Sequence, residues 1–151
     1  MRVAVIGCGS IARQRHAHEY SLNKNCEIAG FFDFVSERAE ALVKEYGGKV
    51  YGTLDELLSD ESVDAVSVCV ANAYHAETTI KALRSGKHVL CEKPMAISLE
   101  DCEAMIKEAE KAGKRLMIGH NQRLTPAHRR AKEIISSGSM GKVLTFSTMF
   151  C

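Results

Sequence analysis

The sequence predicts an α/β fold with a doubly wound parallel sheet of six strands, on the strength of two observations. Short apolar runs alternate with amphipathic segments along almost the whole chain, and a glycine-rich turn directly follows the first run. Strands that alternate with helices form βαβ units, which build a parallel sheet with helices on both faces. Because such crossovers are right-handed, the expected strand order is 3-2-1-4-5-6.

Each expected element has a local signal. The apolar runs predict strands at 2–6, 26–33, 49–51, 64–70, 87–91 and 115–119. Helical spacing predicts helices at 11–22, 36–46, 75–85, 99–113 and 126–138, with a short one opened by Thr53. Capping boxes begin at Thr53 and Ser98, and Thr125-Pro126 supplies an N-cap and a first-turn proline. The inner stripe expected for the helix after Ser98 consists of Leu99, Cys102, Met105, Ile106 and Ala109.

The last ten residues do not belong to this unit. We expect a dinucleotide-binding domain at 1–120, a connecting helix segment at 121–141, and the first strand of a truncated second domain at 142–151. An unpaired strand leaves its N–H and C=O groups without partners. We therefore expect this strand to pair with a second copy of the chain, which predicts a homo-oligomer.

The composition excludes several classes of protein. The chain has 151 residues, of which 46% are hydrophobic and 26% charged, and its net charge is +1. This balance argues against a nucleic-acid-binding surface, and no apolar run reaches the length of a membrane span. The N-terminus has no secretory signal, so we expect a cytoplasmic protein. The six cysteines show no C-x-x-C spacing, which predicts buried thiols and no metal site.

The glycine-rich turn carries the clearest chemistry. Gly7, Cys8, Gly9, Ser10, Ile11 and Ala12 spell G-x-G-x-x-A between the first strand and the first helix. The first glycine permits a tight turn, the second lets a pyrophosphate approach the backbone, and the alanine lets helix and strand pack closely. Asp33 closes the second strand 21 residues beyond Ala12, where a carboxylate binds the adenosine ribose. This is the pattern of a Rossmann-type NAD site, with NADP disfavoured by the charge of Asp33.

Other polar residues allow two interpretations each. Arg13, Arg15, His16 and His18 form either a solvated helix face or a cluster that assists the phosphates. Lys93, in Glu92-Lys93-Pro94, is either an ordinary loop lysine or a group that moves a substrate proton at the carboxyl edge of the sheet. Asn72 and His75 follow the fourth strand at the same edge, and His75 either lines a pocket or merely begins a helix.

With these residues in place, the chain resembles the N-terminal half of the glucose-fructose oxidoreductase / inositol dehydrogenase (Gfo/Idh/MocA) family. The matching segments include VAVIGCGSIA, EIAGFFD, VDAVSVCVANAYHAETTIKALRSGKHVLCEKPMA and NQRLTPAHRRAKEIISSGSMGKV. The resemblance implies NAD or NADP binding and hydride transfer with a sugar, inositol or related polyol. It assigns Lys93 to catalysis and to the nicotinamide ribose, and it places Glu92, Val70, Ala71, Asn72 and His75 near the cofactor.

The chain departs from the family pattern in two respects. Val70-Ala71 stand where the family usually has Thr-Pro before the asparagine, which weakens the assignment of Asn72. The family's substrate domain, with its Asp and His, has no counterpart in these residues.

The leading interpretation is therefore the cofactor-binding half of an NAD(P)-dependent oxidoreductase, inactive by itself. The alternatives are a non-catalytic nucleotide-binding or redox-sensing module, and a methyltransferase.

Overall fold

The computed structural model describes residues 1–147 and 149, which form two compact units, 1–119 and 120–151. The first unit contains a six-stranded, all-parallel sheet in the order β3-β2-β1-β4-β5-β6. This confirms the doubly wound order expected from the sequence. The strands are β1 Arg2–Ile6, β2 Glu27–Phe32, β3 Lys49–Val50, β4 Ala65–Val68, β5 His88–Cys91 and β6 Leu116–Ile118.

The helices lie where the sequence signals place them. In the first unit they are α1 His18–Leu22, α2 Ser36–Tyr46, α3 Leu54–Ser59, α4 His75–Arg84 and α5 Leu99–Ala112, with a 3₁₀ turn η2 at Asn72–Tyr74. Thr53 and Ser98 do cap their helices, because their hydroxyls accept from the backbone N–H groups of Glu56 and Asp101, each at 3.0 Å. The second unit contains a 3₁₀ turn η3 at Asn121–Leu124 and α6 at Pro126–Ser136.

Thr125 is the N-cap residue of α6, as predicted, but its side chain accepts no backbone N–H of the helix. Pro126 occupies the first turn as predicted, but the Thr125 hydroxyl donates to the Gln122 carbonyl oxygen at 3.0 Å. That acceptor lies before the helix, and the same hydroxyl lies 2.8 Å from His128 Nδ1 in α6, so the side chain joins the preceding turn to the helix.

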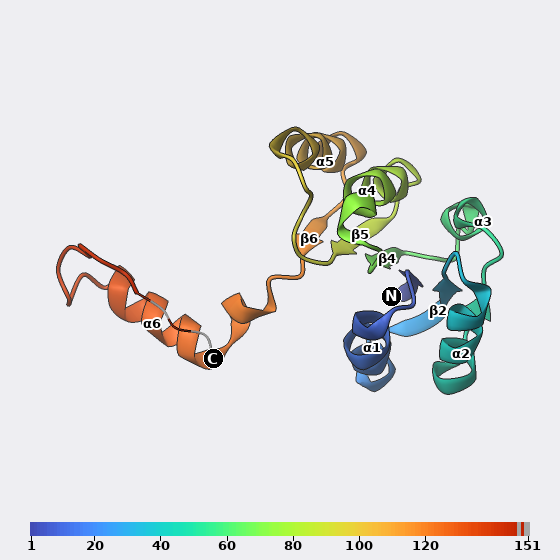
Figure 1. The fold of residues 1–151 in the computed structure, drawn as a ribbon, viewed down its shortest axis with the longest axis horizontal. Coiled ribbons are helices and arrows are strands. Elements are labelled where there is room, and N and C mark those ends of the chain that lie inside the picture. The colour runs from blue at the N-terminus through green and yellow to red at the C-terminus, as the bar shows by residue number, and fades with distance from the viewer. Residues whose placement is uncertain (148, 150–151) are drawn as a thin grey trace. The chain divides into compact units, whose positions relative to one another are not determined.

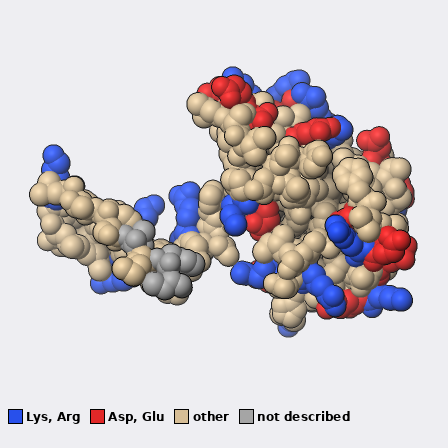
Figure 2. Space-filling view, viewed as in Figure 1, with Lys and Arg blue, Asp and Glu red and all other residues tan. Residues whose placement is uncertain are grey.

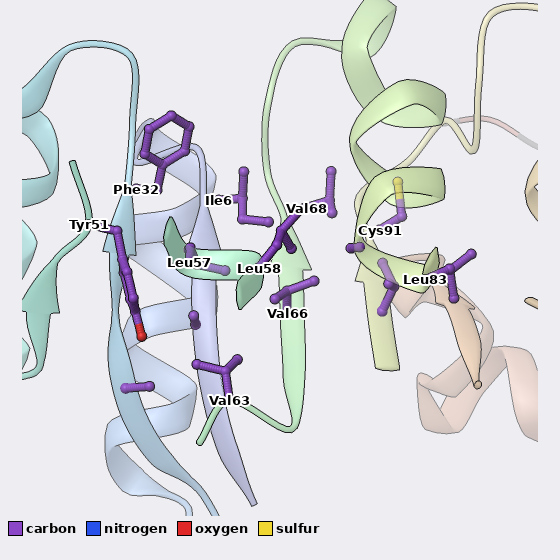
Figure 3. Packing of buried hydrophobic residues seen from close by; sticks show 14 of the residues in the cluster. Ile6, Phe32, Tyr51, Leu57, Leu58, Val63, Val66, Val68, Leu83 and Cys91 are labelled. Atoms are coloured by element: carbon purple, nitrogen blue, oxygen red, sulfur yellow. The ribbon is translucent and has the colours of Figure 1, made fainter. Parts of the chain in front are cut away.

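Both faces of the sheet are covered (Figure 1). Helices α3, α4 and α5 lie on one face, and α1 and α2 on the other. Successive β1 residues point to opposite faces, so Ala4 and Ile6 join the larger cluster and Val5 the smaller one. In Figure 3, side chains of β1, β2 and β4 converge on Leu57 and Leu58 of α3. Each large apolar side chain that is fully buried stabilises the fold by about 1.5–3 kcal/mol.

The first helical segment differs from the uniform helix expected at 11–22. Ser10 and Ile11 are α-helical, a π-helix, η1, follows over Ala12–Ala17, and the segment continues as α1. Arg13, Arg15 and His18 are exposed, as a solvated face requires, but His16 is only 8% exposed. The assignment of His16 to the solvated cluster was therefore wrong, because its ring turns inward beside Ala12 and Ala17.

The strand expected over 142–151 does not form in residues 142–147 and 149, and residues 148, 150 and 151 lie outside the described part. A strand needs a paired neighbour for its backbone groups, and the described chain offers this segment none. Pairing with a second copy stays a prediction.

Acidic and basic side chains are interspersed over the face of the first unit that Figure 2 presents. Several form pairs one helical turn apart, such as Arg15–Glu19 at 2.7 Å and Lys81–Glu77 at 2.8 Å. The mixture matches the net charge of +1.

The inner stripe of α5 is narrower than the sequence indicated. Met105 is fully buried and Ala109 nearly so, whereas Leu99 is 70% and Ile106 47% exposed. We therefore expect Met105→Ala to lower the free energy of unfolding by about 2–5 kcal/mol, because it leaves a cavity under the helix. Leu99→Ala in the same helix is the matched control and should lower the free energy of unfolding by less than about 0.5 kcal/mol. Urea unfolding measures both, and equal losses would contradict the packing described here.

Candidate functional site

The candidate site lies at the carboxyl edge of the sheet, where β1 separates β2 from β4. Backbone hydrogen bonds extend the strand pairing into the loops at this edge. Gly7 N donates to Phe32 O at 2.7 Å, Cys69 N to Ile6 O at 2.7 Å, and Glu92 N to Val68 O at 3.0 Å. These bonds bring the loops after β1, β2, β4 and β5 side by side. Ligands of doubly wound sheets bind in the crevice outside such a switch point.

Gly7 makes the turn out of β1 possible. Its φ is +90°, a conformation that side-chain-bearing residues rarely adopt. A Cβ at this position would lie 2.7 Å from the backbone carbon and oxygen of Cys69. Both the turn and the contact with the loop after β4 therefore require glycine, as the sequence indicated.

Gly9 is different, because nothing in the protein itself demands a glycine there. Its φ is not positive, and a Cβ would meet no atom within 4 Å. The missing side chain leaves an open cradle above the start of η1, flanked by exposed Ser10 and Ile11 and by buried Ala12. Exposed backbone N–H groups at a helix start bind phosphate, and the absent Cβ lets a phosphate approach them. The cradle therefore fits a pyrophosphate.

Asp33 braces the glycine turn. One carboxylate oxygen accepts from Cys8 N at 2.6 Å, and the other accepts from Val35 N at 2.9 Å. Its side chain is 10% exposed, and the Arg38 guanidinium lies 3.8 Å from Oδ1. Asp33 thus serves as a turn residue, and it also lines the adjoining cleft.

A cleft of about 430 Å³ adjoins these residues. Of the residues expected at the cofactor site, its lining contains Gly7, Gly9, Ser10, Ile11, Asp33, Val70 and Ala71. Cys8 lines a neighbouring cleft with Arg13 and Arg38. Ala12, Asn72, His75, Glu92 and Lys93 line neither cleft.

Tyr74 also lines the first cleft, together with Phe34, Val35 and Arg38. The sequence reasoning missed Tyr74, although a solvent-facing aromatic residue just after the fourth strand was a usable signal. Its 55% exposure leaves a ring available to a ligand.

His75 does not face the cleft. It begins α4 and is 1% exposed, with Nδ1 2.6 Å from Pro94 O and Nε2 3.1 Å from Val70 O. The imidazole therefore ties the loop after β4 to the loop after β5. Of the two interpretations, the helix-start position is correct, and the ring serves the backbone of both loops.

The Glu92-Lys93-Pro94 loop is held at both ends. Glu92 Oε1 lies 2.9 Å from His16 Nε2, and Glu92 Oε2 accepts from Lys93 N at 3.1 Å. Pro94 O contacts His75, and the Lys93–Pro94 peptide bond is cis. The Lys93 side chain itself is exposed. Its ammonium is thus presented from a fixed backbone at the edge of the sheet.

With this geometry established, comparison with known proteins identifies the family. A sequence profile described as the oxidoreductase family with an NAD-binding Rossmann fold (Gfo/Idh/MocA) matches residues 1–120. The chain belongs to the Gfo/Idh/MocA family. The resemblance inferred from the motifs is confirmed, and residues 1–120 are the NAD(P)-binding domain of this family.

Relatives within the family act on sugars and inositols. Glucose-6-phosphate 3-dehydrogenase of Bacillus subtilis is 38% identical over 99% of this chain and 42% of its own length. Inositol 2-dehydrogenase of Salmonella typhimurium is 31% identical over 95% of this chain and 44% of its own length. A 3-ketoreductase from Actinomadura kijaniata, solved with NADP and TDP-benzene, superposes with a TM-score of 0.85 and 32% identity over 91% of this chain and 42% of its own. The chain spans about two-fifths of the length of these relatives.

Two further observations bear on this Gfo/Idh/MocA domain. Among residues 1–147 and 149, no cluster of His, Cys, Asp or Glu is arranged to hold a metal ion. Within the same residues, no helix combines the length and apolar character needed to cross a membrane.

The cysteines near the site are protected from ionisation. Burial, reinforced by the Asp33 carboxylate and opposed by Arg38, raises the pKa of the Cys8 thiol to about 12. Burial also raises the pKa of Cys69 well above its ordinary value, and that of Cys91 to about 11. Since the thiolate is the reactive form, these three residues are poor redox sensors.

We therefore expect slow alkylation of these buried thiols. At about pH 8, roughly one Cys8 thiol in ten thousand is ionised, and the fraction rises about tenfold per pH unit below the pKa. Iodoacetamide should modify the half-buried Cys26 and Cys102 first, as peptide mass spectrometry would show. Unfolding in urea should abolish the difference. Labelling of Cys8 or Cys69 as fast as Cys26 in the folded chain would contradict the described burial.

Proposed function

We propose that this chain is the cofactor-binding half of an NAD(P)-dependent oxidoreductase that acts on a sugar, an inositol or a related polyol. The observation that carries the proposal is the convergence of the Asp33-braced glycine turn and the anchored Lys93 loop at one sheet edge. The dehydrogenase and ketoreductase names of the relatives supply the substrate class.

Each part of the site has a role in this proposal. The N–H groups around Gly9 and Ser10 bind the pyrophosphate, and the Asp33 carboxylate accepts from the adenosine ribose hydroxyls. The bound nicotinamide supplies hydride transfer to or from a substrate carbon. Lys93 contacts the ribose of the nicotinamide half, as the family resemblance implies. It also donates a hydrogen bond to the substrate oxygen and helps to move its proton, which is general acid–base chemistry.

The cofactor preference follows from the charge at the ribose. Asp33 presents a carboxylate where NADP would carry its 2′-phosphate, and the two negative charges repel each other. Arg38 partly offsets this repulsion, because its guanidinium lies 3.8 Å from the carboxylate. We therefore propose that NAD(H) binds better than NADP(H).

We expect this chain to bind NADH at least about tenfold more tightly than NADPH, a difference of about 1.4 kcal/mol. Asp33→Ser should lower the ratio of NADH affinity to NADPH affinity by removing the repulsion, and Arg38→Ala should raise this ratio. The ratio is the readout, because loss of the Asp33 brace on Cys8 weakens both complexes. Glu37→Ser, in the exposed first turn of α2, is the charge-matched control and should leave the ratio unchanged. Calorimetric titration decides the preference, and tighter NADPH binding by the unaltered chain would refute it.

We also propose that residues 1–151 bind dinucleotide but do not turn over a polyol alone. Positioning a substrate against the nicotinamide in a pocket without water supplies a large share of the rate. In this family that pocket includes the second domain, which extends beyond the part that this chain matches.

The expected result is NADH binding without NAD reduction when this chain is mixed with inositol or glucose. In a protein that includes the second domain, Lys93→Ala should lower kcat by about 10²–10⁴-fold and weaken NAD binding by only about tenfold. Absorbance of NADH measures turnover in both proteins. Sustained hydride transfer by residues 1–151 alone would show that the second domain is dispensable.

A further inference from the structure

A chain of polar side chains runs through the interior from α1 to the Lys93 loop. The Tyr20 hydroxyl lies 2.5 Å from Ser67 Oγ, which lies 3.1 Å from His16 Nδ1. His16 Nε2 lies 2.9 Å from Glu92 Oε1, and Glu92 Oε2 accepts from Lys93 N. Ser67 in the middle of β4 is fully buried, and the His16 and Glu92 side chains are only 7% and 15% exposed. Neither Ser67 nor His16 lines the cofactor cleft.

One assignment of protons satisfies every contact in this chain. Burial raises the pKa of Tyr20, and in this assignment its protonated hydroxyl donates to Ser67. Ser67 then donates to His16 Nδ1, and a neutral imidazole donates from Nε2 to the Glu92 carboxylate. The last bond is charge-assisted, and such bonds are stronger than those between neutral groups. The series of hydrogen bonds therefore ends at the Glu92 carboxylate, which also accepts from the backbone N–H of Lys93.

The local helix geometry supports a role beyond packing. His16 lies in η1, and single π-turns within α-helices occur frequently at functional sites. An apolar side chain at this inward position could be buried without a hydrogen-bond partner, whereas a buried polar side chain requires one. The polar ring is matched to Glu92, so its specific effect falls on the Glu92 carboxylate.

We infer that His16 is a positioning residue for Lys93, acting through Glu92. This inference rests on the proposed function, in which Lys93 contacts the nicotinamide half of the cofactor. His16 occupies one oxygen of Glu92 and the Lys93 N–H occupies the other, which holds the carboxylate against the backbone. Without the Nε2 donor, the Glu92 carboxylate is free to pair with the ammonium of the adjacent Lys93, which draws that ammonium away from the cofactor.

Two substitutions separate this role from simple packing. Glutamine carries its amide nitrogen at the position of Nε2 and keeps a donor for Glu92, whereas asparagine reaches only the position of Nδ1 and loses it. NADH includes the nicotinamide half, and ADP lacks it. His18→Asn, on the exposed face of the same segment, is the matched control.

We expect His16→Asn to weaken NADH binding by about tenfold and ADP binding by less than about twofold, because only the nicotinamide half senses Lys93. His16→Gln should restore NADH affinity to within about threefold of the unaltered chain. Calorimetry with NADH and ADP, together with thermal unfolding of each variant, provides the data. Equal weakening of NADH and ADP, or no rescue by glutamine, would reduce His16 to a packing residue and overturn the inference.

A double-mutant cycle of His16 and Glu92 gives an independent test of the coupling between them. Glu92→Gln should reproduce the selective loss of NADH affinity, and adding His16→Asn to it should cause little further loss. Additive losses would contradict action through Glu92. If the unaltered chain binds NADH no more tightly than ADP, the nicotinamide half contributes no affinity and the assigned role of Lys93 fails. If it binds neither nucleotide, the proposed function itself fails.

Discussion

The whole site depends on the hydrogen bonding of β1 to strands on both of its sides. β1 pairs in parallel with β2 on one side and with β4 on the other, so the chain builds one side of the sheet from β1 to β3 and then crosses to β4 on the other side. The loops that follow these strands then diverge around the end of β1 and leave a crevice there. At this edge Asp33 accepts from Cys8 N on the β2 side, and Gly7 lies close to the Cys69 backbone on the β4 side. Without the central pairing, none of these groups would meet.

Much of the fold and of the cofactor site was predictable because the responsible constraints are local. G-x-G-x-x-A requires only one strand and one helix start, and Asp33 requires only the end of the next strand. The caps at Thr53 and Ser98 act within a single turn. For such features the neighbouring residues contain most of the information that determines the structure.

The features that sequence reasoning missed depend on distant partners. Nothing near His16 indicates that its ring meets Ser67 and Glu92, and a regular helical period does not describe the π-segment that turns it inward. Leu99 and Ile106 fit the apolar stripe of α5, but both are exposed, because helical spacing does not show how much of a helix face its neighbours cover. The strand expected at 142–151 fails in its described part because a strand also needs a neighbour, which a pattern in one segment cannot supply.

The two buried imidazoles have a consequence for the entropy of ligand binding. His16 holds Glu92 and His75 holds Pro94, so the backbone on either side of Lys93 is ordered before any ligand arrives. Ordering the backbone of a free loop costs about 1–2 kcal/mol per residue. Here that cost is met when the domain folds, and only the exposed lysine side chain loses freedom when a ligand binds. The loop therefore combines a rigid main chain with one mobile cation.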